Sequence, residues 1–206
     1  EPEQVVEGLM ALGELTVLGG PPKAMKSWTA KTIGLSIAGA RPWMGFTVPR
    51  PYKVLYISAE GREVRLKSRL LKLLAFLNTP EEVLDNIEYL CTMGRLKLDT
   101  ELGEKTFLKL IEPFSVVIID PYYRFISNAD ENSHKDQRVI QDLLDRVKET
   151  GKCILLVHHT RKPSGGVDTG ISELRGAGLD GFADGVLMLR RKRDEHDDLF
   201  TLRFTL

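Results

Sequence analysis

The sequence predicts an α/β fold in which a mostly parallel central sheet is flanked by helices and ends in a C-terminal antiparallel hairpin. Segments with strand character alternate with segments whose apolar residues recur at helical spacing, which is typical of βα units. Two runs, 116–119 and 154–157, are apolar at every position, as expected for parallel strands covered by helices on both faces. Residues 186–189 and 200–204 flank an acidic turn at 194–198 and predict the hairpin.

The other elements follow from the same patterns along the chain. In chain order we expect strands at 15–18, 53–58 and 87–90, helices at 28–38, 62–77, 106–111 and 139–148, and loops at 42–51, 122–136 and 160–181. The helix at 62–77 is expected to bury a broad apolar face that includes Val64 and Leu71. Its basic side is expected to face solvent rather than to bind nucleic acid.

Composition bounds the class of protein and its partners. With 206 residues the chain is long enough for one complete core, and we expect a single domain over 1–206. Because the chain begins with Glu1-Pro2-Glu3 and not with methionine, we expect that it is excised from a longer protein. Lysine plus arginine and aspartate plus glutamate number 29 each, which excludes a bulk positive field that would hold nucleic acid nonspecifically.

The cysteines and the hydropathy indicate the compartment. Cys91 and Cys153 are far apart in sequence and resemble free thiols of a reducing compartment more than a disulfide or metal framework. No apolar stretch has the length of a membrane span, and no segment resembles a signal peptide. The sequence therefore predicts a cytoplasmic protein without a membrane partner.

A phosphate-binding loop is predicted directly after the first strand. From Gly20 to Ser27 the residues have the spacing of G-x-x-x-x-G-K-[ST], a motif whose backbone N–H groups hold phosphates at the positive end of a helix. Lys26 would contact the terminal phosphates and Ser27 would bind magnesium. The predicted nucleotide-binding residues are Gly20, Pro21, Pro22, Lys23, Ala24, Met25, Lys26, Ser27 and Trp28.

Met25 departs from the motif because it stands where the second glycine is expected. Only the tightness of the turn depends on a residue without Cβ, so the departure weakens the match and does not remove it. The strand before the loop and the helix after it supply the context that the motif requires.

The other unusual polar residues also follow predicted strands. Glu60 follows the second strand, Asp120 closes one apolar run, and His158 and His159 close another. Ligands of such sheets bind outside the carboxyl ends of the strands. We therefore expect these side chains to meet Lys26 at one rim of the sheet.

Each of these residues has a candidate role. Asp120 is the expected second magnesium ligand, and Glu60 is the expected general base for the water that attacks the γ-phosphate. The two histidines alternate across a strand, so only one faces the site; we favour His159 as the γ-phosphate sensor and expect the other to be a core residue. As alternatives, Asp120 could merely cap a strand, and Glu60 could be favoured by the helix dipole.

With these residues in hand, the chain resembles the RecA-like ATPases, and among them the hexameric replicative helicases of the plasmid RepA type and the related ATPases of phages and mobile elements. The resemblance covers nearly the whole chain. It rests, in the order of that family, on the segments 19–28, 56–61, 116–121, 157–162 and 173–178. It implies a RecA-like P-loop NTPase fold with ATP and magnesium as ligands.

The resemblance also implies a complete catalytic set. Glu60 matches the catalytic glutamate of that family, Asp120 its second-motif aspartate, and the histidine pair its sensor position. Arg175 matches an arginine that reaches into the neighbouring subunit's site, where its guanidinium stabilises the developing phosphate charge. The implied catalytic residues are Glu60, Lys26, Asp120, His159 and Arg175, and the implied assembly is a homo-oligomeric ring, hexameric in the family.

Single-stranded DNA is the partner that the resemblance implies. In the family, loops equivalent to 122–135 and 161–174 line a central channel and touch DNA. Here they offer Tyr123, Arg124, Arg161 and Lys162 for stacking and phosphate contacts. Because the chain has no excess of positive charge, this partner is inferred from the resemblance alone, and paired tyrosines are as often packing residues.

Together these features predict a magnesium-dependent ATPase that couples hydrolysis to binding, translocation or remodelling of single-stranded DNA in replication. Two alternatives stay open. One is a nucleotide-gated binding or assembly module with little hydrolysis, because Met25 distorts the loop. The other is a RecA-like ATPase that serves recombination or signalling without helicase activity.

Overall fold

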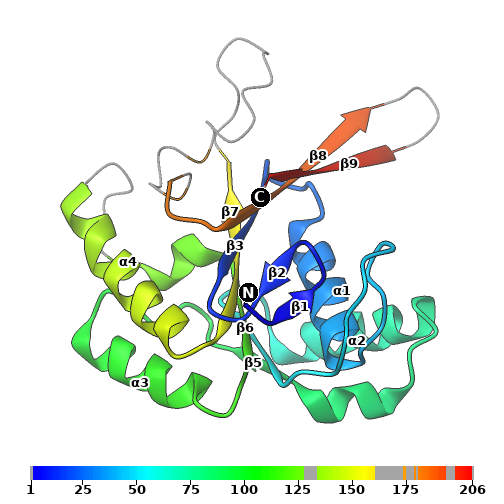
Figure 1. Cartoon of the computed structure of the whole chain (residues 1–206), viewed down its shortest axis with the longest axis horizontal. Coiled ribbons are helices and arrows are strands. Elements are labelled where there is room, and N and C mark those ends of the chain that lie inside the picture. The colour runs from blue at the N-terminus through cyan, green and yellow to red at the C-terminus, as the bar shows by residue number, and fades with distance from the viewer. Residues whose placement is uncertain are drawn as a thin grey trace.

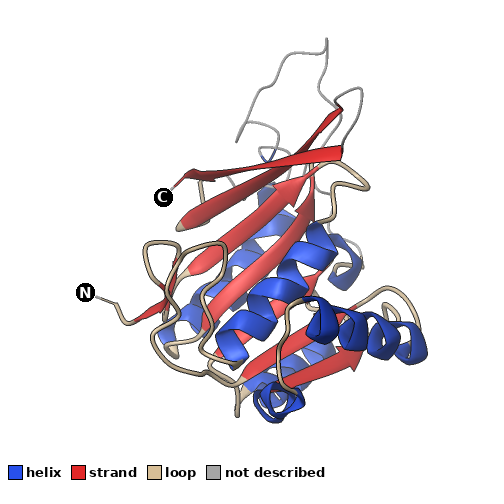
Figure 2. Ribbon diagram, turned by 90° about the vertical axis from the view of Figure 1, so that its right-hand side faces the viewer, coloured by secondary structure: helices blue, strands red, loops and turns tan. Residues whose placement is uncertain are grey.

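A twisted sheet forms the centre of the molecule and is covered by helices on both faces (Figure 1 and Figure 2). The computed structural model describes residues 2–127, 134–160, 174, 179, 181–193 and 198–205. Within them the seven strands lie in the order β5-β4-β6-β7-β3-β8-β9. The strands are β3 (Leu15–Gly20), β4 (Val54–Ser58), β5 (Ile87–Cys91), β6 (Val116–Asp120), β7 (Cys153–His159), β8 (Gly185–Arg193) and β9 (Asp198–Thr205).

Neighbouring strands of this sheet pair in parallel except for β8 and β9, which form an antiparallel hairpin. The predicted α/β class, with its mostly parallel sheet and C-terminal hairpin, is therefore confirmed. A separate two-stranded ribbon, β1 (Gln4–Val6) and β2 (Met10–Ala11), precedes the first strand of the main sheet.

The helices divide between the two faces of the sheet. The helical elements are α1 (Lys26–Ala38), α2 (Glu63–Phe76), η1 (Glu81–Asn86), α3 (Glu101–Ile111), η2 (Tyr122–Phe125) and α4 (His134–Glu149). Successive residues of a strand point to opposite faces: Val54 and Tyr56 of β4 pack in the cluster that contains α1 and α2, whereas Leu55 and Ile57 pack with α3 and α4. Because both faces are buried, strands such as β4 and β6 are apolar at nearly every position.

Two helices are longer than predicted. The helix expected at 106–111 begins at Glu101, because the Thr100 hydroxyl caps it by accepting a hydrogen bond from the Gly103 N–H at 3.1 Å. The helix expected at 139–148 begins at His134. The loop expected over 122–136 is thus wrong at both ends, since η2 forms a short turn that the buried Phe125 anchors in the core.

The apolar face expected for α2 is too broad. Its buried residues are Leu66, Leu70, Leu73 and Leu74. Val64 is 81% exposed and Leu71 is 47% exposed, so both assignments to the core are wrong. The helix packs against the rest of the protein along a single stripe. Three to four apolar residues per two turns are enough to form such a stripe.

Two further features bear on the sequence predictions. Cys153 is buried in β7 and Cys91 is half-buried at the end of β5, and neither forms a disulfide. In the part of the chain that the structure describes, none of the helices combines the length and the apolar character that crossing a membrane requires.

Candidate active site

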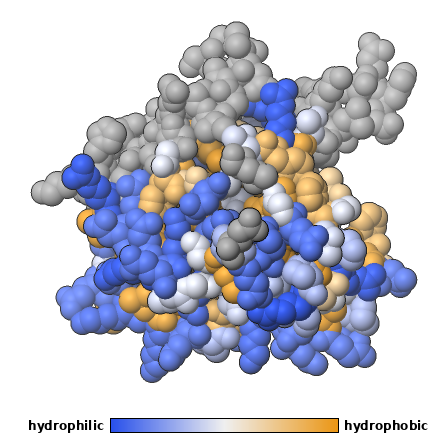
Figure 3. Space-filling view, in the orientation of Figure 1, coloured by the Kyte–Doolittle hydropathy of each residue, from blue (hydrophilic) through white to orange (hydrophobic). Residues whose placement is uncertain are grey.

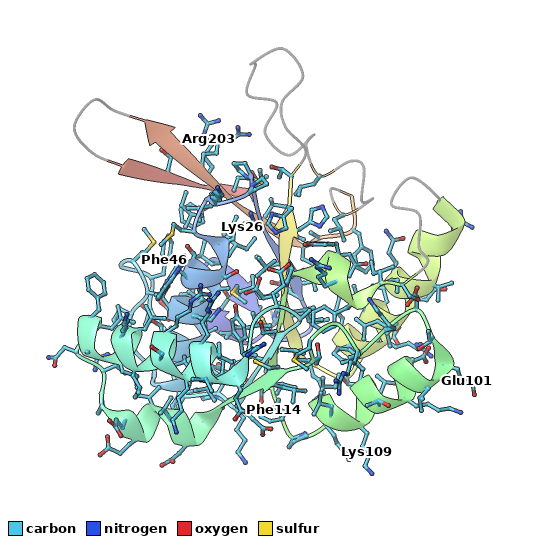
Figure 4. The ribbon with its side chains drawn as sticks, turned by 180° about the vertical axis from the view of Figure 1, so that it is seen from behind. Lys26, Phe46, Glu101, Lys109, Phe114 and Arg203 are labelled. Carbon is cyan, nitrogen blue, oxygen red and sulfur yellow. The ribbon has the colours of Figure 1, made fainter. Side chains whose placement is uncertain are left out.

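The carboxyl ends of the adjacent strands β4, β6, β7 and β3 meet at one edge of the sheet. The strand register aligns Gly20 with His159 and Ser58 with Asp120. Lys26 lies at this edge, beneath the β8–β9 hairpin, whereas Lys109 lies on α3 near the opposite edge (Figure 4). The topology therefore gathers the polar strand ends around the loop that joins β3 to α1.

Gly20 brings this loop against the neighbouring strand β8. A Cβ at position 20 would lie 2.3 Å from the backbone oxygen of Leu189, a distance that no side chain tolerates. The Gly20 carbonyl accepts a hydrogen bond from the Thr160 N–H at 3.1 Å. The first glycine of the predicted motif is thus fixed by contacts on both sides of β3.

Met25 has the left-handed backbone conformation that glycine adopts easily, with φ 66° and ψ 13°. This conformation costs a residue with a Cβ about 1–2 kcal/mol. Its carbonyl accepts the N–H groups of Trp28 and Thr29 at 2.9 and 3.0 Å, and α1 begins at the next residue. The loop therefore forms the turn that the motif requires, although Met25 stands in place of the second glycine.

The Lys26 ammonium group is held inside the loop. Its Nζ donates hydrogen bonds to the carbonyl oxygens of Gly20 and Pro21, both at 2.7 Å, and lies 3.1 Å from Nδ1 of His159. Burial lowers the pKa of Lys26 to about 8, although the Asp120 carboxylate opposes this effect. A cation paired mainly with neutral oxygens is well prepared for the negative charge of a phosphate chain.

Ser27 and Asp120 come together across the sheet edge, with the Ser27 hydroxyl donating to Oδ1 of Asp120 at 3.0 Å. Magnesium prefers hard oxygen ligands and usually takes one or two from the protein and the rest from phosphates and water. The described residues contain no cluster of three or more histidine, cysteine or carboxylate side chains. The hydroxyl and carboxylate oxygens at this edge fit a magnesium ion that is shared with a nucleotide.

Glu60 follows β4 and is held by two residues of η2. Its Oε1 accepts a hydrogen bond from the Tyr123 hydroxyl at 3.0 Å and another from Nε of Arg124 at 3.3 Å. Glu60 and Arg124 are both about half exposed, at 49% and 55%. Two residues expected at DNA thus contact the expected general base.

The two histidines have different surroundings. His159 is half-buried against Lys26, and its ring meets the edge of Tyr123 with centroids 5.5 Å apart. His158 is buried on the other face of β7, 6.3 Å from the Tyr122 ring. Burial, with smaller contributions from His159 and Lys26, lowers the pKa of His158 to about 4. His159 is therefore the one placed to respond to a phosphate at Lys26.

Comparison with known proteins identifies the family of the chain. The sequence profile of a protein family described as an AAA domain matches residues 1–165. The chain belongs to this AAA domain family. None of the curated proteins compared with the chain matches it.

Solved structures show the fold of this AAA domain. The flagellar accessory protein FlaH from Methanocaldococcus jannaschii is 15% identical with a TM-score of 0.59, and the match covers 94% of this chain and 78% of that one. A KaiC-like protein from Pyrococcus horikoshii OT3 is 13% identical with a TM-score of 0.60, covering 97% and 82%. The RecA-like P-loop ATPase domain expected from the sequence motifs is confirmed.

The AAA domain also has a buried polar network that the sequence did not reveal. The Tyr56 hydroxyl donates a hydrogen bond to Oδ2 of Asp120, and Nζ of Lys31 lies 3.7 Å from the same oxygen. Lys31 also donates to the Tyr56 hydroxyl at 2.9 Å and to the Ser27 carbonyl at 3.2 Å. Burial lowers the pKa of Lys31 and raises that of Tyr56. A lysine on the sheet-facing side of α1 was the available signal.

Three predicted site residues lie outside the described part of the chain. They are Arg161, Lys162 and Arg175. Their roles stay predictions.

Proposed function

We propose that this AAA domain is a magnesium-dependent ATPase. The observation that carries the proposal is the juxtaposition, at the N-terminus of α1, of the Lys26 ammonium group with the Ser27–Asp120 pair. A helix N-terminus attracts phosphate through its N–H groups and its dipole. These three side chains add a cation and two hard oxygen ligands at the same point.

The chain's own groups suit hydrolysis of a terminal phosphate. Lys26 stabilises negative charge on the phosphates, and His159 lies beside it to respond to their presence. Glu60 accepts the proton of the attacking water, for which a carboxylate at this edge is suited. Magnesium, held by Ser27 and Asp120, would neutralise charge on the β- and γ-phosphates.

Hydrolysis by two lysine variants tests this proposal. Lys26→Ala is expected to reduce magnesium-dependent ATP turnover at least about a hundredfold, since preorganised charge at a phosphate is a large catalytic effect. Lys109→Ala removes an exposed lysine from α3 and is expected to leave turnover unchanged. Full activity in Lys26→Ala, or equal loss in both variants, would exclude this site as the catalytic centre.

The finer proposal is that hydrolysis is coupled to single-stranded DNA in a cytoplasmic ring, possibly of six copies, in replication. It is supported by the resemblance to RepA-type helicases and by the exposure of Arg124 beside Glu60. In this proposal Tyr123, Arg124, Arg161 and Lys162 contact DNA, while Arg175 completes a neighbouring copy's site.

ATP hydrolysis with and without single-stranded DNA, on a sample whose mass is measured by light scattering, tests this finer proposal. Stimulation by DNA in a ring-sized species supports it. A monomer whose ATP turnover is the same with and without single-stranded DNA contradicts it. Stimulation without strand displacement by the full-length protein would instead favour an ATPase of recombination or signalling.

A nucleotide-gated binding or assembly module is a second candidate. The observation that favours it is the engagement of Glu60, whose Oε1 already accepts bonds from Tyr123 and Arg124. The similar structures are a flagellar accessory protein and a KaiC-like protein, and neither is described as a helicase. Tight ATP binding together with negligible turnover would favour this module.

A further inference from the structure

An apolar pocket opens directly beside the phosphate-binding loop. Its volume is about 580 Å³, which is within the usual range for small-molecule sites. Its walls include Met25, Trp28, Met44, Phe76, Leu189 and Leu202, from the start of α1, the loop after it, α2 and the β8–β9 hairpin. Figure 3 shows hydrophobic side chains gathered beneath this hairpin.

The pocket borders the predicted phosphate-binding loop. Met25 is the residue before Lys26, and Trp28 and Thr29 belong to the first turn of α1. A nucleotide whose terminal phosphates lie at Lys26 therefore extends its ribose and base past this turn. The base is the apolar, flat end of such a ligand, and it fits a wall that carries an indole and two thioethers.

The polar groups of the lining are mostly engaged within the protein. The Thr29 hydroxyl donates to the Met25 carbonyl at 3.2 Å. The Thr32 hydroxyl donates to the Thr29 carbonyl at 2.8 Å and accepts from Nε1 of Trp43 at 3.0 Å. Leu189 and Leu202 pair with each other in the β8–β9 ladder. The polar side-chain groups that remain in the described lining are the Lys72 ammonium group and the Trp28 indole N–H, and both are donors.

Met25 contributes a side chain to the pocket wall at a backbone position that glycine would adopt more easily. Its left-handed backbone would be easier for glycine, yet its side chain is 43% exposed and lies in the pocket wall. Glycine at this position would leave the pocket wall without this thioether.

We propose that this pocket holds the nucleobase, that Met25 contributes a contact to it that glycine could not supply, and that the pocket discriminates weakly between purines. This inference rests on the proposed function, since it requires a nucleotide at Lys26. The weak discrimination follows because apolar walls distinguish similar ligands poorly.

The binding of three ligands measured by titration calorimetry, in the presence of magnesium, tests the proposal. The ligands are ATP, GTP and inorganic tripolyphosphate, which lacks a base. In the wild-type protein we expect ATP and GTP to bind within about tenfold of each other, and tripolyphosphate to bind at least about tenfold more weakly.

Variants of Met25 separate the base contact from the loop. Met25→Ala keeps the Cβ and is expected to weaken ATP and GTP binding about five- to tenfold while tripolyphosphate binding is unchanged. Met25→Gly removes the strain as well, so it should lose the same base contact and bind tripolyphosphate at least as tightly as the wild type. Met93→Ala is the matched control, because Met93 is also left-handed, with φ 49°, and is 55% exposed outside the pocket.

Three outcomes would overturn the proposal. If Met25→Ala weakened the binding of all three ligands equally, Met25 would act on phosphate binding and not on the base. A preference of more than about a hundredfold for one purine would require hydrogen-bond readout of the base. A change of mass in light scattering with unchanged affinities would make the pocket an interface with a second copy. The measured quantity is binding affinity, so this test is separate from the test of hydrolysis. A protein that binds the three ligands in the expected pattern without hydrolysing ATP would contradict the proposed ATPase but would support the base pocket.

Discussion

His158 is expected to make the folded state sensitive to mild acid. It is 5% exposed on the central strand β7 and pairs in register with Gly19. Burial, followed by the nearby His159 and Lys26, lowers its pKa from 6.5 to about 4. In the unfolded chain the imidazole takes up a proton near its ordinary pKa, whereas the native protein resists protonation until the pH approaches 4.

The sign and the size of the effect follow from this difference. Between the two pKa values the unfolded state binds more protons than the native state, so the free energy of unfolding falls as the pH falls. A pKa lowered from 6.5 to about 4 corresponds to about 3 kcal/mol. This loss is absent above about pH 6.5 and nearly complete at about pH 4.

Urea unfolding at a series of pH values measures the loss. The variant His158→Gln removes the titrating group, and the difference between its pH profile and that of the wild type isolates the contribution of His158 from those of the carboxylates. His159→Gln is the matched control and should change the profile less, because His159 is half-buried and its pKa is lowered to a smaller extent. Parallel profiles for the wild type and His158→Gln would refute the reasoning, whatever the absolute stability of the variant.

Three other substitutions, two of them paired with a control variant, test the packing and the site. Gly20→Ala, which places a Cβ 2.3 Å from a backbone oxygen of β8, should lower the melting temperature by several degrees, whereas Gly181→Ala meets nothing within 4 Å and should not. Tyr56→Phe removes a hydrogen bond from Asp120, the proposed magnesium ligand, and should cost about 1–3 kcal/mol in urea unfolding. Tyr89→Phe should be nearly neutral, because that buried hydroxyl has no partner among the described residues. Arg124→Ala should leave stability within about 0.5 kcal/mol and raise DNA-independent ATP turnover several-fold, since it frees a lone pair of Glu60, the proposed general base.

Each of these expectations can fail in a recognisable way. An unchanged melting temperature for the first glycine variant would mean that the strands separate at little cost. Equal destabilisation by both tyrosine variants would show that the loss does not come from the Tyr56–Asp120 hydrogen bond. Reduced turnover in the arginine variant would make that side chain a positioning residue for the glutamate.

The strands and helices could be predicted from the sequence wherever burial alone determines them. The runs 116–119 and 154–157 are apolar on both faces, and each lies between two parallel strands. Helix starts were less accessible, because they depend on local bonds that leave no periodic signal. The first turn of α3 is fixed by the Thr100 cap and carries an exposed Leu102, so its residues do not repeat on one apolar face.

The sequence could predict those site residues whose position follows from the order of the strands alone. Parallel strands bring their carboxyl ends together, which is why Lys26, Asp120 and His159 could be expected at one edge. Side chains that reach this edge from inside an element could not be expected in the same way. Tyr56 has the pattern of an ordinary strand residue, and Lys31 was notable only as a lysine on the sheet-facing side of its helix. The packing of α1 on β4 turns both toward the same carboxylate oxygen.

The contact between Glu60 and η2 links the proposed roles that the sequence had separated. Tyr123 and Arg124 cannot hold Glu60 and at the same time offer the same hydroxyl and guanidinium Nε to a DNA strand. A DNA phosphate that pairs with Arg124 would therefore release Glu60, the proposed general base. On this geometry DNA and Glu60 compete for the same donors, so a partner bound at η2 would activate the site without contacting the nucleotide. The ATPase and the nucleotide-gated module then differ only in how often Glu60 is released.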